Sequence, residues 1–184
     1  MLNITLKKTL QGEILDVGGG GEGVIGRIYQ AQVTAVDNRQ DELDEAPSGF
    51  RKLLMDARAL AFPAASFDHV TAFYALMYMP KEAQAQAVAE AARVLKPGGT
   101  FHIWDANIAS ASPEPFLAEL AVNANGEAIR VTYGIVREHA RQDAAHFIAL
   151  CASAGLCLSE REDAEEGFYL RFTKQEEDLS LIHI

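Results

Sequence analysis

The sequence ILDVGGGGEG, residues 14–23, decides the fold class of this chain. Its first four residues are three aliphatic side chains and one aspartate, which is typical of a short buried strand. Four consecutive glycines follow at residues 18–21, and residues 22–29 favour a helix. Because glycine has no Cβ, its backbone can approach a ligand that other residues would exclude. The stretch therefore predicts a strand, a tight turn and a helix, with a nucleotide-like cofactor at the turn.

Short apolar runs alternate with helical stretches along most of the chain, as in proteins with a parallel sheet. We expect helices at 22–29, at 81–95 and in the segment that ends at Gly155. The apolar runs predict seven strands, at 13–17, 33–36, 50–55, 67–73, 100–105, 156–159 and 167–172. The expected fold is α/β, a doubly wound, mostly parallel seven-stranded sheet in a single domain of residues 1–184.

Residues 107–137 interrupt this alternation after the fifth predicted strand. The stretches 116–122 and 128–136 flank Asn125-Gly126, a dipeptide that suits the positive φ angles of a tight turn. We therefore predict a β-hairpin insertion. The residues before position 13 are too few for helices that would cover a substrate, so the hairpin is expected either to cover the substrate side or to form a homodimer contact.

The composition narrows the classes of partner. The chain has 184 residues and a formal net charge of −10, with many acidic residues in its C-terminal quarter. Such a surface repels phosphate backbones and anionic lipid, so we expect a small-molecule substrate, no nucleic acid and no membrane. The sequence has no apolar run of membrane-spanning length, which favours a cytoplasmic location. The five histidines show no pairing typical of a metal site, so no metal is expected.

Two carboxylates refine the prediction of the cofactor. Asp37 follows the second predicted strand, where a carboxylate can accept hydrogen bonds from both hydroxyls of a ribose. The glycine pattern alone also fits a dinucleotide and hence a nicotinamide-dependent oxidoreductase. However, a carboxylate at Asp16 would repel a pyrophosphate and attract an ammonium group. These residues favour a ligand that is cationic at that end.

Four stretches, in order and spacing, resemble the motifs of the class I S-adenosylmethionine-dependent methyltransferases of small-molecule type. They are Asp16-x-Gly18-x-Gly20, Asp37, residues 55–70 and residues 93–101. The resemblance implies a Rossmann-like methyltransferase, with S-adenosylmethionine as cofactor and S-adenosylhomocysteine as product. It implies that the cofactor is bound by Asp16, Gly18, Gly19, Gly20, Asp37, Asn38, Asp56, Ala57, Phe73 and Tyr74.

The same resemblance implies where these residues lie along the cofactor. The glycines would line the methionine part with Asp16 beneath it, and the two aromatic residues after the fourth strand would border the methyl group. Asp37 and Asn38 would contact the ribose and adenine, while Asp56 and the N–H of Ala57 would meet the adenine edge. One residue departs from the family pattern, because Glu22 occupies the place of its third glycine.

The acceptor and the catalytic residues stay unknown at this level. Methyl transfer from a sulfonium is a direct displacement, and a general base is needed only when the acceptor must lose a proton. Candidates for that role are His139, Tyr133, Tyr78 and Asp105. The leading hypothesis is methyl transfer to a small, partly apolar molecule, and the alternative is a catalytically inactive, cofactor-binding regulatory or partner subunit.

Overall fold

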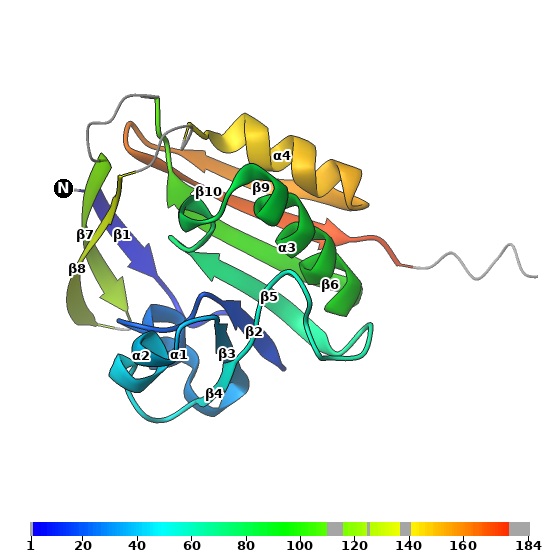
Figure 1. The fold of residues 1–184 in the computed structure, drawn as a ribbon, viewed down its shortest axis with the longest axis horizontal. Helices are drawn as coiled ribbons and strands as arrows, with labels where there is room; N and C mark the ends of the chain where they lie inside the picture. Colours follow the sequence, from blue (N-terminus) through cyan, green and yellow to red (C-terminus); the bar gives the residue numbers. More distant parts are fainter. Residues whose placement is uncertain (1, 110–115, 125, 137–140, 177–184) are drawn as a thin grey trace, which may run out of the picture.

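A computed structural model describes residues 2–109, 116–124, 126–136 and 141–176. Seven strands form the central sheet in the order β4-β3-β2-β5-β6-β10-β9 (Figure 1). The strands β4 to β6 in this order are parallel, and β10 is antiparallel to both of its neighbours. The α/β fold with a mostly parallel seven-stranded sheet is thereby confirmed. The strands are β2 (Ile14–Val17), β3 (Val33–Asp37), β4 (Arg51–Leu54), β5 (Phe67–Phe73), β6 (Leu95–Ala106), β9 (Leu156–Asp163) and β10 (Gly167–Lys174).

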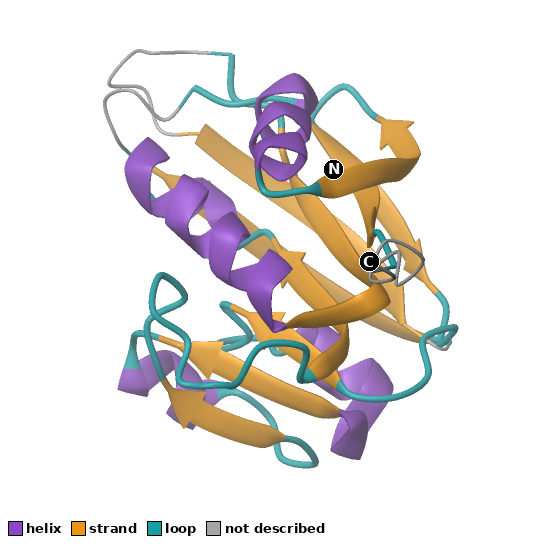
Figure 2. Cartoon of the chain, turned by 90° about the vertical axis from the view of Figure 1, so that its right-hand side faces the viewer, coloured by secondary structure: helices purple, strands orange, loops and turns teal. Residues whose placement is uncertain are grey.

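Two helices, α3 (Lys81–Val94) and α4 (Ala144–Ser153), lie along one face of this sheet (Figures 1 and 2). Their apolar residues, among them Val88 and Phe147, form one buried cluster with the sheet. Asp143 caps the N-terminus of α4, and its side chain accepts a hydrogen bond from the backbone N–H of His146 at 2.9 Å. No helix in the described part of the chain is long and apolar enough to cross a bilayer.

The opposite face is covered by α1 (Val24–Tyr29) and by a second, three-stranded sheet in the order β1-β7-β8. Its strands are β1 (Leu2–Leu6), β7 (Phe116–Ala124) and β8 (Glu127–Ile135). The predicted hairpin is present, since β7 and β8 are antiparallel and Ala124 pairs with Glu127. Gly126 has the positive φ of 91° that its turn requires, while Asn125 lies outside the described residues.

The strand β1 was not predicted. It pairs in parallel with β7, from Leu2 opposite Leu120 to Leu6 opposite Ala124. Its sequence, LNITL, alternates apolar and polar residues, which is the pattern of a half-buried strand. The hairpin is therefore the larger part of a sheet that packs on α1 and the main sheet, not an isolated protrusion.

Two boundaries and one further element differ from the prediction. The helix α1 starts at Val24 and not at residue 22, because Gly21 and Gly23 have left-handed φ angles of 57° and 54°. The strand β6 begins directly after α3, at Leu95, and so includes the residues expected to form the loop before position 100. An acidic helix, α2 (Gln40–Glu45), was not predicted, because Leu43 is its single buried residue.

Candidate cofactor site

A cavity with a volume of about 860 Å³ lies where the chain leaves β2, β3, β4 and β5. Ligands of open α/β sheets bind at this carboxyl edge of the parallel strands. Eight of the ten predicted residues line the cavity: Gly18, Gly20, Asp37, Asn38, Asp56, Ala57, Phe73 and Tyr74. The other two, Asp16 and Gly19, do not line it.

Asp16 lies beneath the glycine turn and is 2 % exposed. Its carboxylate accepts a hydrogen bond from the Thr71 hydroxyl at 2.7 Å, and a Cβ on Gly19 would come within 2.5 Å of it. Burial raises the pKa of Asp16 to about 7, although the bond from Thr71 acts in the opposite direction. The residue therefore supports the turn from below, and it does not offer an open carboxylate to a ligand in the cavity.

All four backbone N–H groups of the glycine turn donate to other parts of the protein. Those of Gly18 and Gly19 donate to the Val36 carbonyl at 2.8 and 3.3 Å. That of Gly20 donates to an Asp37 carboxylate oxygen at 3.3 Å, and that of Gly21 to the Glu42 carbonyl at 2.7 Å. A pyrophosphate is usually held by such groups, so this turn does not favour a dinucleotide.

The glycines are required by the protein itself as much as by a ligand. A Cβ on Gly18 would lie 2.5 Å from the Cβ of Ala75, and Gly18 has a φ of 69°. A Cβ on Gly20 would lie 2.7 Å from the Cβ of Glu42. The sequence-based explanation, that a side chain here would occupy the cofactor's space, is therefore incomplete, because the side chain would first displace the chain's own neighbouring elements.

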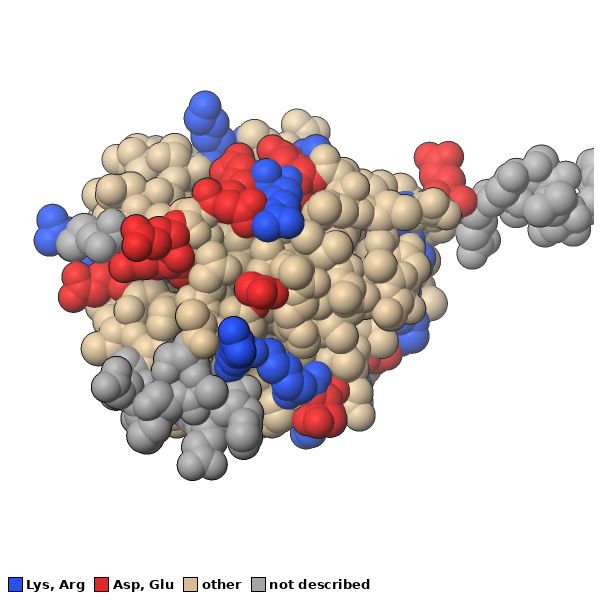
Figure 3. Space-filling model, turned by 90° about the horizontal axis from the view of Figure 1, so that it is seen from above, with Lys and Arg blue, Asp and Glu red and all other residues tan. Residues whose placement is uncertain are grey.

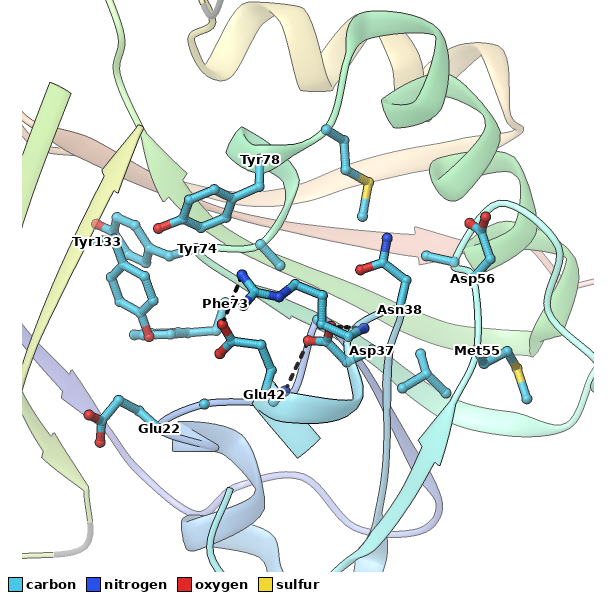
Figure 4. A pocket seen from close by; sticks show the side chains of 18 of the residues that line it. Glu22, Asp37, Asn38, Glu42, Met55, Asp56, Phe73, Tyr74, Tyr78 and Tyr133 are labelled. Carbon is cyan, nitrogen blue, oxygen red and sulfur yellow. Dashed lines mark hydrogen bonds and ion pairs between the residues drawn. The ribbon is translucent and has the colours of Figure 1, made fainter. Parts of the chain in front are cut away.

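Asp37 lies at the end of β3, between the glycine turn and Asn38 (Figure 4). One carboxylate oxygen accepts from the backbone N–H of Arg39 at 3.0 Å, and the other accepts the long bond from Gly20. Each oxygen has two acceptor sites, so the carboxylate retains the capacity to accept from hydroxyl groups of a ligand. This is the arrangement that a ribose requires.

Asp56 follows β4 and forms the far wall of the cavity with Met55 and Ala57. Its carboxylate is held by Arg58, whose Nη2 lies 2.6 Å away and whose Nε lies 3.0 Å from both oxygens. Hydrogen bonding from Arg58 lowers the pKa of Asp56 below its usual range. The predicted contact between Asp56 and an adenine amino group therefore competes with this ion pair.

An aromatic wall closes the opposite end of the cavity (Figure 4). Tyr133 of β8 stacks on Tyr74, with ring centroids 5.1 Å apart and an interplanar angle of 13°. Phe73 lies 6.2 Å from Tyr133, and the Tyr78 hydroxyl accepts from the backbone N–H of Gly134 at 3.2 Å. Burial raises the pKa of Tyr74, Tyr78 and Tyr133, so these hydroxyls keep their protons near neutral pH.

The four candidates for a general base differ in their position relative to the cavity. Tyr78 and Tyr133 line the cavity. Asp105 does not, because it is fully buried and accepts hydrogen bonds from Gln142 and from the backbone N–H groups of Ala106 and Met77. It braces the turn after β5 instead of facing a substrate. His139 lies outside the described residues.

Several residues that line the cavity were not predicted. Thr132 comes from the hairpin, which was expected to cover the substrate side, but only its neighbour Tyr133 had been named as a candidate. Glu22 stands out in the sequence only as a departure from the glycine pattern. The remaining unpredicted residues with polar or flexible side chains are Arg27, Arg39, Glu42, Glu45, Met55, Arg58 and Met79.

A parallel sheet with a glycine turn after its first parallel strand, a carboxylate after the next and an aromatic border after β5 agrees with the resemblance of the sequence to the class I S-adenosylmethionine-dependent methyltransferases. Residues 15–103 match the family described as "Methyltransferase domain", which supports a class I S-adenosylmethionine-dependent methyltransferase. S-adenosylmethionine is accordingly its cofactor.

The chain is 34% identical over 114 residues to the sterol 24-C-methyltransferase erg-4 of Neurospora crassa; the match spans 55% of this chain and only 29% of that protein. A SAM-dependent methyltransferase from Methanosarcina mazei has a similar structure, with a TM-score of 0.68, 17% identity and coverage of 91% of this chain and 95% of that one. The [4+2]-cyclase SpnF also has a structure similar to that of this chain, with a TM-score of 0.64 and 17% identity. The match covers 91% of this chain and 76% of that one. At these identities, the structural likenesses concern the fold alone.

Proposed function

We propose that this chain transfers a methyl group from S-adenosylmethionine to a small, partly apolar acceptor, and that the eight predicted residues lining the cavity bind the cofactor. The observation that supports this most strongly is the division of the cavity into two ends. Asp37, Asn38 and Asp56 provide polar groups for a nucleoside, while Phe73 and Tyr133 provide an aromatic surface at the other end. A volume of about 860 Å³ leaves room for a second small molecule beside the cofactor.

When bound, S-adenosylmethionine supplies an electrophilic methyl group on its sulfonium. The contribution of the protein is to hold the accepting atom in line with that methyl group and to exclude water. The aromatic wall of Phe73, Tyr74 and Tyr133 is suited to both tasks. Because the Tyr133 hydroxyl stays protonated, it can donate a hydrogen bond to the acceptor but cannot take up its proton at neutral pH.

The hairpin takes part in this function through β8, because Thr132 and Tyr133 line the cavity. Deleting residues 116–136 would also remove the buried Leu120 and Val131, so a deletion would test folding and not function. We therefore expect the substitution Tyr133→Leu to reduce methyl transfer strongly while changing S-adenosylhomocysteine affinity by no more than a few-fold. Glu119→Gln, on an exposed position of β7, is the matched control.

The acceptor class is supported by two observations. The Neurospora relative is a sterol methyltransferase, and a sterol is largely apolar, as is the wall formed by Phe73 and Tyr133. The net charge of −10 disfavours nucleic acid, and on the face in Figure 3 the described basic side chains lie beside acidic ones without forming a continuous basic surface.

The experiment that tests the proposal is transfer of a radiolabelled methyl group from S-adenosylmethionine to fractionated small-molecule extracts. Label in a partly apolar fraction, lost in Tyr133→Leu and kept in Glu119→Gln, is the expected result. Tight binding of S-adenosylhomocysteine with no label in any fraction would instead support the alternative of an inactive regulatory subunit.

A further inference from the structure

Two side chains of opposite charge line the cavity where the glycine turn enters α1. They are Glu22, which occupies the place of the family's third glycine, and Arg27, one turn further along the chain. Figure 4 shows Glu22 on the side of the cavity away from Asp56. None of the expectations for the cofactor site assigned a role to either residue.

The two side chains are close but only loosely paired. The Nε of Arg27 donates to the Glu22 carbonyl at 2.8 Å, which fixes the guanidinium beside the turn. The ion pair itself is long, with 3.6 Å between Arg27 Nη2 and Glu22 Oε2, and a second contact to Glu127 measures 3.9 Å. Glu22 is 50% exposed and Arg27 32%. Such pairs contribute little to stability, so both charges are available to a ligand.

The other guanidinium groups on the cavity wall are more tightly engaged. Arg58 forms a bidentate pair with Asp56, whose shortest distance is 2.6 Å. Arg39 is hydrogen-bonded to Asp41 and lies 3.3 Å from Glu42. Arg27 is therefore the basic side chain of the described cavity lining whose ion pairs are the longest.

The methionine end of the cofactor carries an ammonium and a carboxylate on the same carbon atom. Neither the Asp16 carboxylate nor the backbone N–H groups of the glycine turn are free to bind this end. Asp16 is buried beneath the turn, and the N–H groups of residues 18–21 all donate within the protein. A zwitterion requires one acceptor and one donor of opposite charge, side by side, and Glu22 with Arg27 provides that combination.

We propose that Glu22 and Arg27 form a clamp for the α-amino acid end of the cofactor. The Glu22 carboxylate accepts from the ammonium, and the Arg27 guanidinium donates to the carboxylate. The ligand thereby replaces a loose, solvent-exposed ion pair with two closer ones. This inference rests on the proposed function, because it takes S-adenosylmethionine as the ligand of the cavity.

Calorimetric titration with two ligands tests the clamp. S-adenosylhomocysteine carries the amino acid end, whereas 5′-methylthioadenosine has the nucleoside and the thioether without it. We expect Glu22→Gln and Arg27→Gln each to weaken S-adenosylhomocysteine binding about ten-fold, the loss typical of a hydrogen bond to a charged group. Binding of 5′-methylthioadenosine should stay within about two-fold of the parent. Glu127→Gln, which also removes a partner of Arg27 but lies outside the cavity, should change neither.

Three outcomes would overturn the clamp while the parent still binds S-adenosylhomocysteine, so that the proposed function stands. Affinity for S-adenosylhomocysteine could be unchanged in both variants, or both ligands could weaken equally, which would indicate a structural effect. Tighter binding in Glu22→Gly, which restores the family's glycine, would show that Glu22 obstructs the site. If the parent binds neither ligand, the proposed function fails and the clamp fails with it.

Discussion

Asp37 lines the cavity, and we propose that it binds the ribose of the cofactor. Its carboxylate faces the cavity and retains acceptor capacity beyond the bonds from Gly20 and Arg39. We expect Asp37→Asn to weaken S-adenosylhomocysteine binding by about 1.5–3 kcal/mol, because an amide replaces a charged acceptor. Titration calorimetry measures this loss. The control is Asp44→Asn, on the exposed side of α2, and equal affinities in both variants would remove Asp37 from the site.

Gly18 tests whether the glycine turn is required by the fold. Alanine at this position would have to adopt a φ of 69° and would place its Cβ 2.5 Å from that of Ala75. Gly126 has a φ of 91°, but a Cβ on it would meet no described atom within 4 Å, so Gly126→Ala isolates the backbone cost, about 1–2 kcal/mol. Urea unfolding should show a clearly larger loss of the free energy of unfolding for Gly18→Ala than for Gly126→Ala. Equal losses would contradict the close approach of Ala75.

For single residues, the sequence predicted well which ones surround the cavity. It predicted their contacts less well. The motif order identified eight residues of the cavity wall, because the strand ends of a parallel sheet converge at one edge. It did not reveal that Asp16 is shielded by Gly19, since the face on which a strand residue lies depends on the packing of α1 above it. The proximity of Glu22 and Arg27 to the cavity likewise follows from where α1 begins.

Among the secondary-structure elements, β1 ties the N-terminal residues to the hairpin that borders the cavity. Leu6 is 8% exposed and pairs with Ala124, whereas Thr5 on the same strand is exposed. We expect Leu6→Ala to lower the free energy of unfolding by about 2–3 kcal/mol and Thr5→Ala by less than about 0.5 kcal/mol. Chemical denaturation measures both. Similar small effects would mean that β1 contributes little to the second sheet.

The elements that were missed have shorter or less apolar patterns than most of the elements that were predicted correctly. Residues 67–73 combine β-branched and aromatic side chains, and residues 81–94 repeat apolar positions at helical spacing. By contrast, β1 is only five residues long and α2 buries only Leu43. Both are specified by tertiary contacts, with β7 and with the glycine turn, which a local pattern does not contain.

The whole molecule buries titratable groups whose effects on stability oppose one another. Burial raises the pKa of Asp105 to about 7, so its contribution is present below the unfolded value of 3.8 and is lost as the pH rises through 7. Burial lowers the pKa of His102 to about 3, so its contribution is present above 6.5 and is lost as the pH falls through 3. The contributions of Asp105 and His102 to the free energy of unfolding therefore change with pH in opposite directions and partly cancel.

A substitution at Asp105 makes its contribution to the pH dependence of stability measurable. In Asp105→Asn the group no longer titrates, although the bonds from Gln142, Ala106 and Met77 are disturbed at every pH. We expect the destabilisation of this variant relative to the parent to shrink as the pH rises from about 4 to about 7, because over this range Asp105 ionises in the unfolded parent but stays protonated in the folded one. Unfolding curves across this range provide the test. A difference that is constant with pH would mean that Asp105 titrates as it does in the unfolded chain.

The fold of the whole molecule does not by itself select a reaction, since a [4+2]-cyclase and a methyltransferase have structures similar to this chain. The central claim is therefore that the cavity binds the methyltransferase cofactor. Titration calorimetry of the parent chain with S-adenosylhomocysteine and with NAD tests it most directly. We predict saturable binding of S-adenosylhomocysteine at a single site, weakened by Asp37→Asn, and no heat with NAD. Binding of NAD with no response to S-adenosylhomocysteine would contradict the account.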